Sequence, residues 1–249
     1  MLTGFYTIAS GMLSQQRNLD VIGNNLVNAE TPGFRTERMV FTTFEHELMI
    51  RKEAYSRTGI GSASPITLAD DVITLHHSGL FQETGFPYDI AIDGPGYFVV
   101  QGNAAQPYLT RGGQFNMDTE GYLILPGVGR VMGENGPILV KNALFTVLGN
   151  GQVNNDAGRR IDNLQIVSPP LVDDMIRLNN GMYQIREGVQ TESSDSYRLH
   201  QGVVEKSNVD YNREITTFME VQRAFQACSS ALQMYDAINR RSVSAIASI

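Results

Sequence analysis

The last 45 residues contain no glycine or proline, and this constrains the fold of the chain more than any other feature. Nothing between Glu205 and Ile249 breaks a helix, and a helix of that length reaches about 60 Å. A series of ten positions three and four apart runs from 218 to 249, and eight of them are apolar: Phe218, Val221, Phe225, Cys228, Leu232, Tyr235, Ile246 and Ile249, with Asn239 and Ser242 as the two polar members. A second side carries small residues at Ala224, Ala227, Ala231 and Ala245, with Met234 and Ile238 among them. Such a helix would overhang any small domain and has two sides able to pack.

The N-terminal end carries a matching stripe at Leu2, Phe5, Ala9, Met12, Leu19 and Leu26. We expect this helix to end near Asn28, because Thr31-Pro32-Gly33 follows and a residue before proline disfavours the helical region. A helix with one apolar face usually packs on its own domain. Here the stripes lie at opposite chain ends, around a region large enough to have its own core. We therefore expect the ends to pair into one helical domain whose copies pack together.

Between the ends the pattern changes to short strands. Eighteen of the 24 glycines fall between residues 76 and 204, where tight turns require positive φ. The sequence predicts an α+β fold with helical segments 1–36 and 205–249 in coiled-coil pairing, and a mostly β domain at 76–204. Residues 37–75 form a connecting arm or extended segment, in which Phe41 to Ile50 could be helical or extended.

Charge and composition exclude several classes of function. The net charge of −7 divides into zero for 1–36, −2 for 37–75, −5 for 76–204 and zero for 205–249. Nucleic-acid binding is disfavoured because the chain has no basic patch to neutralise phosphates. The N-terminus has no Lys or Arg before Arg17 and no long apolar run, so we expect neither a Sec signal nor membrane insertion. Cys228 lies on the apolar stripe and is interpreted as a small core residue.

No set of residues predicts catalysis. His76 and His77 lie near Asp70 and Asp71, but neighbouring residues of a strand point to opposite faces, so the histidines cannot easily share a metal ion. The glycines at 127, 129 and 133 fit a turn better than a phosphate loop. We therefore predict no catalytic, cofactor-binding or metal site, no cofactor and no enzymatic activity.

Four sequence blocks resemble a known family. Residues 19–34, LDVIGNNLVNAETPGF, closely resemble the N-terminal signature of the bacterial flagellar rod and hook proteins. Residues 207–210 and 222–227, SNVD and QRAFQA, resemble its closing signature. Residues 84–100 and 108–115 resemble the β-domain motifs of the same family. The blocks occur in the family's order and cover most of the chain, and the length and the 37–75 segment resemble rod proteins more than the longer hook protein.

The resemblance implies a structural subunit of the flagellar basal-body rod. In that family the terminal helices form an inner tube, copies assemble helically around a channel, and the shaft transmits torque to the hook. It implies export by the flagellar type III apparatus without a cleaved signal, a place in the basal body, and contacts with itself, other axial proteins and surrounding ring proteins. Proximal and distal rod positions both stay open.

Two groups of residues follow from this reading. The packing group lines the helix stripes: Leu2, Phe5, Met12, Leu19, Leu26, Phe218, Val221, Phe225, Leu232, Tyr235 and Ile246. The hinge and register group is Asn24, Asn25, Asn28, Pro32, Gly33, Gln222 and Arg223. We expect the asparagine amides at the end of the first helix to meet unsatisfied carbonyls and neighbouring backbone, and Gly33 to redirect the chain. Two alternatives remain: a hook-like axial subunit, and an envelope enzyme or ligand-binding β domain with an oligomerisation coil.

Overall fold

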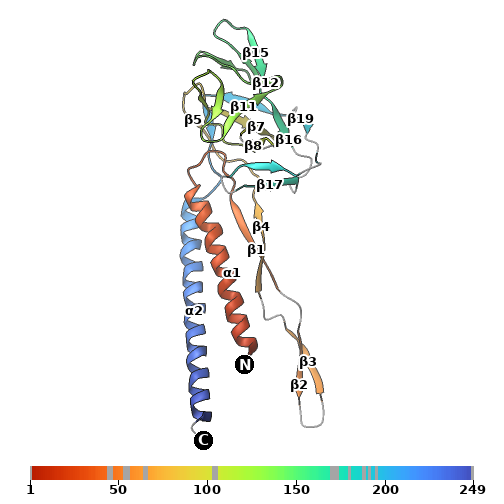
Figure 1. Ribbon diagram of the computed structural model, residues 1–249, viewed down its shortest axis with the longest axis vertical. Helices are drawn as coiled ribbons and strands as arrows, with labels where there is room; N and C mark the ends of the chain where they lie inside the picture. Colours follow the sequence, from red (N-terminus) through yellow and green to blue (C-terminus); the bar gives the residue numbers. More distant parts are fainter. Residues whose placement is uncertain are drawn as a thin grey trace. The chain divides into compact units, whose positions relative to one another are not determined.

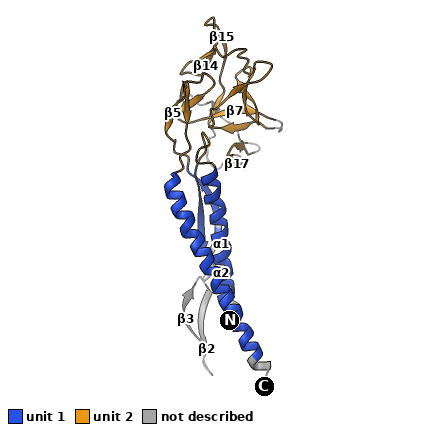
Figure 2. Cartoon of the chain, turned by 90° about the vertical axis from the view of Figure 1, so that its left-hand side faces the viewer, with its two compact units in different colours: residues 1–27, 36–75, 210–249 blue, residues 28–35, 76–209 orange. Residues whose placement is uncertain are grey.

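The computed structural model divides the chain into two compact units (Figure 2). It describes residues 2–43, 47–52, 57–63, 67–102, 106–168, 174–178, 181–186, 189, 192–193 and 196–247. The helical unit comprises 1–27, 36–75 and 210–249, and the β unit comprises 28–35 and 76–209. The chain therefore passes between the units four times, and two of these passages bracket the eight residues 28–35.

The helical unit is built on two helices, α1 (Leu2–Val27) and α2 (Tyr211–Ala247), which lie side by side (Figure 1). They are antiparallel, since Phe5 contacts Tyr235 near one end and Asn25 contacts Glu214 near the other. The end of α1 at Val27 confirms the boundary predicted from the Thr-Pro-Gly turn. Neither helix is long and apolar enough to cross a membrane, among the residues described.

The start of α2 differs from the sequence expectation. Although no residue from Glu205 onward breaks a helix, α2 begins only at Tyr211. Asp210 caps it, because its side-chain oxygen accepts the Arg213 N–H at 3.2 Å and its carbonyl accepts the Glu214 N–H at 2.9 Å. Upstream, Glu205 ends a strand and its carboxylate is buried. Tertiary contacts therefore override helix propensity at 205–210.

The segment between the helices forms antiparallel ribbons. Strand β1 (Glu37–Thr43) pairs with β4 (Thr67–Thr74), with a bulge between Val40 and Phe41. Strand β2 (Glu47–Lys52) pairs with β3 (Arg57–Ala63). Both β1 and β4 contact α1. The described parts of the Phe41–Ile50 stretch are thus extended, which decides between the two readings left open for it.

The β unit consists of short antiparallel strands. Its largest sheet has the strand order β17-β18-β8-β7-β11-β10-β9, with β12 beside β11 and β16 joining β7 to β19. Smaller pairings are β5 with β21, β6 with β20, and β13-β14-β15. The bounds are β5 (Phe81–Glu83), β6 (Ile90–Asp93), β7 (Tyr97–Gln101), β8 (Tyr108–Thr110), β9 (Asn116–Met117), β10 (Leu123–Leu125), β11 (Gly129–Gly133), β12 (Gly136–Pro137), β13 (Thr146–Val147), β14 (Gln152–Asn154), β15 (Arg160–Asn163), β16 (Ile166–Ser168), β17 (Met175–Arg177), β18 (Tyr183–Ile185), β19 (Glu192–Ser193), β20 (Arg198–Gln201) and β21 (Val203–Glu205). Two helices with many short antiparallel strands make the predicted α+β fold.

The β unit has its own hydrophobic core. Fifteen buried side chains form it, most of them between residues 90 and 166: Ile90, Ile92, Phe98, Val100, Phe115, Leu123, Val131, Ile138, Val140, Phe145, Val147, Val153, Leu164, Ile166 and Leu199. Phe98 and Phe115 pack edge to face at 5.0 Å between ring centroids. All fifteen residues belong to the β unit, so this core is separate from the helix contact.

Candidate functional site

The helix stripes predicted from the sequence lie mainly at the α1–α2 contact. Val221 is buried on α2, and most other members of the packing group are half-buried: Met12, Leu19, Leu26, Phe218, Phe225, Leu232 and Tyr235. Phe5 is more exposed, although its ring lies 6.3 Å from that of Tyr235. The side chains of Leu2 and Ile246 lie outside the described residues.

The most enclosed side of α1 is offset from the stripe. Its buried residues are Ser14, Val21, Ile22 and Asn25, and none of them belongs to the predicted apolar series. The cause is the ribbon of β1 and β4, which also packs on α1. Arg17 anchors that ribbon, because its guanidinium donates to the Ala69 carbonyl at 3.1 Å.

Asn25 is the central polar residue of the helical unit and has no exposed surface. Its side-chain oxygen accepts the Glu37 N–H at 2.9 Å, and its amide donates to the Glu37 carbonyl at 2.8 Å. The same amide lies 3.3 Å from the Glu214 carboxylate. Asn25 therefore satisfies the backbone of β1 as a neighbouring strand would, while also contacting α2.

Asn24 and Asn28 also contact neighbouring groups, as Asn25 contacts the backbone of β1. Asn24 donates to the Glu37 carboxylate at 3.0 Å. Asn28 belongs to the β unit, where its carbonyl accepts the Thr31 N–H at 3.1 Å and its side chain contacts the Thr31 hydroxyl at 3.2 Å. The sequence indicated that these amides matter but gave no signal for Glu37 as their partner.

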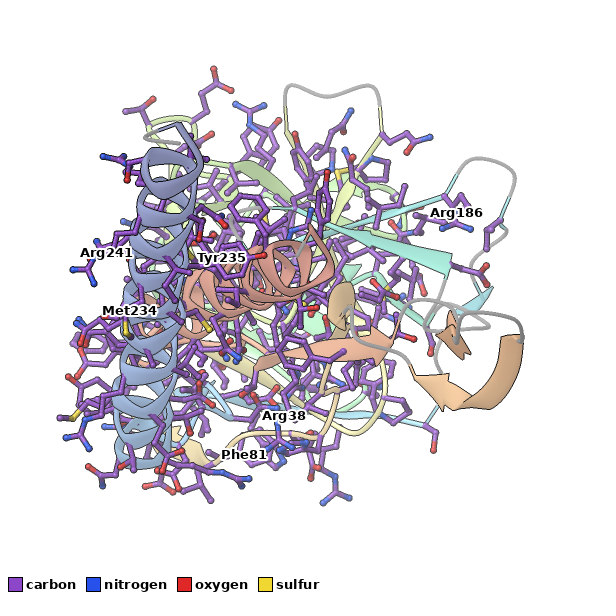
Figure 3. All side chains as sticks on the ribbon, turned by 90° about the horizontal axis from the view of Figure 1, so that it is seen from below. Arg38, Phe81, Arg186, Met234, Tyr235 and Arg241 are labelled. Carbon is purple, nitrogen blue, oxygen red and sulfur yellow. The ribbon has the colours of Figure 1, made fainter. Side chains whose placement is uncertain are left out.

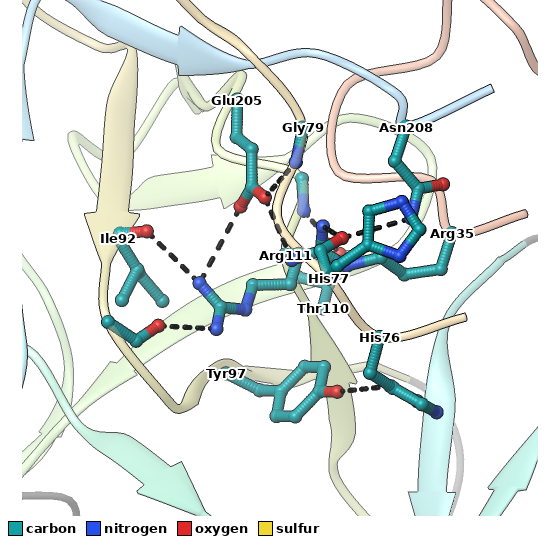
Figure 4. Close-up of polar contacts among 12 residues, drawn as sticks. Arg35, His76, His77, Gly79, Ile92, Tyr97, Thr110, Arg111, Glu205 and Asn208 are labelled. Atoms are coloured by element: carbon teal, nitrogen blue, oxygen red, sulfur yellow. Dashed lines mark hydrogen bonds and ion pairs between the residues drawn. The ribbon is translucent and has the colours of Figure 1, made fainter. Parts of the chain in front are cut away.

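The β unit contains a buried ionic cluster centred on Glu205 (Figure 4). The Glu205 carboxylate lies 2.8 Å from the Arg35 guanidinium, and both side chains are 1% exposed. It also accepts the Gly79 N–H at 3.0 Å and lies 3.5 Å from Arg111, which is 6% exposed. Removing Glu205 would leave two buried arginines without their counter-charge, which is costly in a medium of low dielectric constant.

The arginines of this cluster also hold the surrounding backbone. Arg111 donates to the Ile92 and Gly94 carbonyls at 3.0 and 2.6 Å. Arg35 donates to the His77 carbonyl, and Arg177 donates to the Arg35 carbonyl at 2.8 Å. These groups gather three chain segments that adjoin the passages between the units, namely the stretches ending at residue 35, beginning at 76 and ending at 209.

Aromatic rings compensate part of the positive charge. Arg177 lies 4.6 Å from the centroid of the Phe34 ring, and Arg111 lies 5.4 Å from that of Tyr97. The Nδ1 atom of His76 is 3.0 Å from the Tyr97 hydroxyl. Burial, together with the positive charges of Arg35, Arg177 and Arg111, lowers the pKa of His76 below its ordinary value of 6.5.

Gly33 fits this cluster because no side chain could replace its hydrogen. Its φ is 72°, and a Cβ atom there would lie 2.3 Å from the Arg111 backbone carbon. Its N–H donates to the Glu205 carbonyl at 2.8 Å. The Pro32–Gly33 turn thus joins the 28–35 segment to the strand that carries Glu205, as well as redirecting the chain.

A groove of about 730 Å³ in the β unit was not predicted from the sequence. Phe34, Phe86, Phe115, Leu125 and Met182 are among its lining residues, and Asp89 is the one ionisable acid in that lining. The Asp89 carboxylate accepts the Thr84 hydroxyl at 2.6 Å. The described lining has no cysteine, histidine or lysine, so it offers none of the usual nucleophile–base pairs.

Gln222 and Arg223 are exposed on α2. The His77 backbone carbonyl, which accepts from Arg35, also accepts the Asn208 amide at 2.9 Å. Within the described part of the chain, no group of three His, Cys, Asp or Glu side chains is placed to hold a metal ion.

Glu205, Arg35 and Arg111 are the residues that sequence reasoning missed. Two of them were nevertheless close to recognised motifs, since Arg35 follows the Thr-Pro-Gly-Phe turn and Arg111 lies inside the 108–115 block.

Comparison with known proteins gives the family. Residues 5–35 match the family model described as flagella basal body rod protein, and residues 200–245 match that of the flagellar basal body rod FlgEFG protein C-terminal. The chain is 30% identical to the flagellar basal-body rod protein FlgG of Bacillus subtilis, over 96% of this chain and 97% of the relative. It is 28% identical to the basal-body rod protein FlgF of Caulobacter vibrioides over the full length of both. A shorter match covers 53% of the chain and 30% of the flagellar hook protein FlgE of Treponema pallidum, at 32% identity. The chain belongs to the family of flagellar basal-body rod proteins.

Proposed function

We propose that this chain is a structural subunit of the flagellar basal-body rod, assembling with copies of itself and other axial proteins. The observation that carries the proposal is the antiparallel pair of α1 and α2, whose outer surfaces still expose large apolar residues. Tyr6 and Leu13 on α1, and Met234 and Ile238 on α2, are each more than half exposed. Such surfaces are suited to packing against further helices.

In this proposal the paired helices, with coiled-coil spacing, form the wall of a hollow shaft, and the β unit lies in its outer layer. The ionic cluster would resist rotation of the chain segments that join the units, because it binds three of them through buried hydrogen bonds and ion pairs. Such a subunit would transmit torque toward the hook. Export by the type III apparatus without a cleaved signal, and contact with ring proteins, complete the proposal.

A hook-like subunit is the second candidate, and the match to the Treponema pallidum hook protein favours it locally. The rod is the better choice, because the named rod relatives align over nearly their whole length. Both FlgF and FlgG occur among them, so proximal and distal positions remain equal expectations.

The test is a charge in the helix contact. Phe225→Asp places a carboxylate at a half-buried position of α2, while Phe225→Leu preserves the apolar surface. We expect Phe225→Leu to be incorporated into purified basal bodies and Phe225→Asp to be absent from them, with the β unit folded in both. Incorporation of Phe225→Asp at the wild-type level would contradict the proposed packing.

A further inference from the structure

We propose that the groove of the β unit receives an arginine side chain of a neighbouring protein subunit, whose guanidinium pairs with Asp89. The groove is the one of about 730 Å³ described above. All of its lining residues lie in 28–35 or 76–209, so the inference concerns the β unit alone. It rests on the proposed function in one respect, because the neighbouring subunit would be another axial protein of the rod.

Asp89 is a buried acid whose hydrogen bonding the chain leaves incomplete. It is 7% exposed, and one of its carboxylate oxygens accepts the Thr84 hydroxyl at 2.6 Å. The other oxygen has no hydrogen-bond donor and no ion-pair partner among the described residues. The backbone holds the residue in place, because the Asp89 N–H donates to the Phe86 carbonyl at 3.1 Å and the Asp89 carbonyl accepts the Gly202 N–H at 2.7 Å. One accepting oxygen is therefore fixed beside the groove and unused.

The two other buried acids of the described chain receive three donors each. Asp162 is also 7% exposed, and it accepts the backbone N–H and the side-chain amide of Asn135 and the N–H of Asn163, at 2.8 to 3.1 Å. Glu205 faces two arginines and a backbone N–H. A buried carboxylate is normally paired in this way, because water no longer solvates it. Asp89 is the exception, and the groove is the place where a further donor can enter.

The lining of the groove favours a cation that carries an apolar stem. It contains no lysine, arginine or histidine, and Asp89 is its one carboxylate, so a cation supplies the complementary charge. Arginine suits aromatic surroundings better than lysine, because a guanidinium is more weakly hydrated and stacks on aromatic faces. Arg130 makes such a contact within this chain, 4.1 Å from the centroid of the Tyr122 ring. Four rings are available in the groove: Phe34, Phe86, Tyr88 and Phe115.

The groove is open enough to admit a segment of another chain. Thr31, Gln114 and Asn116 of its lining are exposed, and Phe86 is 67% exposed. Arginine and aromatic side chains are enriched among the residues that anchor protein interfaces. A solvated Asp89, with water as its only further partner, is the competing explanation, and it predicts no preference for a cation.

Peptide binding separates the two explanations. The probes are acetyl-Leu-Arg-Leu-amide and the same peptide with citrulline, which has the shape of arginine without its charge. Binding to the full chain is followed by NMR of the methionine methyl groups, because Met182 lines the groove and its signal is assigned from Met182→Leu. Met234 lies on the side of α2 that faces away from α1 (Figure 3) and serves as the internal reference. We expect a saturable shift at Met182, with at least about fivefold tighter binding of the arginine peptide. Equal binding of the two peptides, or no response at Met182, would overturn the inference.

An Asp89→Asn variant tests the carboxylate itself. Asparagine keeps an oxygen for the Thr84 hydroxyl but removes the charge. We expect it to weaken binding of the arginine peptide about fivefold and to leave the citrulline peptide unaffected. Asp156→Asn removes the same charge at an exposed turn and should change neither. Equal weakening of both peptides would show that the carboxylate acts only on the fold. If Asp89→Asn does not fold, the comparison of the two peptides on the wild-type chain still decides.

Cross-linking in assembled rods tests the source of the arginine. Photoreactive benzoylphenylalanine takes the place of Phe86, and basal bodies are purified and irradiated. We expect a cross-link to an axial protein at a peptide that contains arginine, with about fivefold lower yield when Asp89→Asn is also present. A second copy is able to supply the side chain, because Arg159 and Arg186 are exposed and have no ion-pair partner among the described residues.

The outcomes separate this inference from the proposed function. Basal bodies that contain the labelled chain without such a cross-link would overturn docking in the rod, and a free guanidinium compound would then be the ligand. A labelled chain without the Asp89 change that is absent from basal bodies, where the wild-type chain is absent as well, would contradict the proposed function. The peptide measurement, which needs only the isolated chain, would then decide the chemistry of the groove.

Discussion

Replacing Glu205 by glutamine should destabilise the β unit strongly although the side chain keeps its shape. Glutamine retains an oxygen that can accept the Gly79 N–H, which now bonds to the carboxylate at 3.0 Å. It loses the negative charge that faces Arg35 at 2.8 Å and Arg111 at 3.5 Å. Removing one partner of a buried ion pair typically costs 3–5 kcal/mol, and we expect about 3 kcal/mol here because one hydrogen bond survives.

The measurement is urea unfolding followed by the near-ultraviolet circular dichroism of tyrosine. The chain has no tryptophan, and six of its ten tyrosines, at 88, 97, 108, 122, 183 and 197, lie in the β unit. Glu120→Gln is the matched control, because its carboxylate pairs with Arg130 at 2.6 Å but is 65% exposed. That change should have a much smaller effect, since water screens the pair.

A double variant tests whether charge is the cause. Arg35→Met combined with Glu205→Leu removes both charges of the closest pair, so it should cost less than the two single changes together. A loss below about 1 kcal/mol for Glu205→Gln, or strict additivity in the double variant, would refute the argument that the cluster is held by a buried ion pair.

Three further substitutions test other parts of the structure. Asn25→Ala should destabilise the helical unit by about 2 to 3 kcal/mol, because it leaves the Glu37 N–H and carbonyl unpaired. Faster hydrogen exchange at the Glu37 amide would show this loss. Asn24→Ala, which removes a bond to the Glu37 carboxylate, should have a smaller effect. Gly33→Ala should prevent normal folding of the β unit, whereas Gly127→Ala, at a φ of 75° with no atom within 4 Å of the added Cβ, should cost about 1 kcal/mol in urea unfolding. The pKa of His76 in the folded chain lies below its ordinary value of 6.5, so at pH values near and below 6.5 the unfolded chain binds more protons at this residue than the folded chain does. The free energy of unfolding therefore decreases as the pH falls. His76→Gln should weaken this dependence between about pH 7.5 and pH 5.5. Equal acid sensitivity of the His76→Gln and wild-type chains would contradict the last expectation.

Periodic signals predicted the helices well and the strands less well. The stripe from Phe218 onward and the Thr-Pro-Gly turn after Asn28 predicted both helices, because a long helix repeats its pattern many times. Strands such as Gly136–Pro137 and Glu192–Ser193 have two residues each and show no repeat. The apolar run Ile138–Val140 is typical of a strand, yet that part of the chain forms only an isolated bridge from Leu139 to Tyr122. These short pairings are fixed by tertiary contacts that no local pattern specifies.

The ionic cluster could not be predicted for a different reason. Arg35 and Glu205 are far apart in sequence, and each looks like an ordinary surface residue when read alone. Their pairing depends on β21 placing Glu205 beside the segment that follows Gly33. Gly33 could be singled out because a glycine after a proline is typical of a turn. Charged residues such as Arg35 and Glu205 are common on protein surfaces, so their residue type does not indicate burial.

The signature from Asn24 to Phe34 reads as one hinge in the sequence, yet it contains two separate anchors. Asn24 and Asn25 hold β1 within the helical unit, whereas Gly33 joins the strand of Glu205 within the β unit. The residue types differ because the tasks differ: an amide offers a donor and an acceptor to a neighbouring strand, and glycine allows two backbones to meet closely. Because the anchors share no partner, Asn25→Ala and Gly33→Ala should act independently. Hydrogen exchange would show this as faster exchange confined to one unit in each variant, and loss of protection in both units from either change would mean that the signature is a single coupled hinge after all.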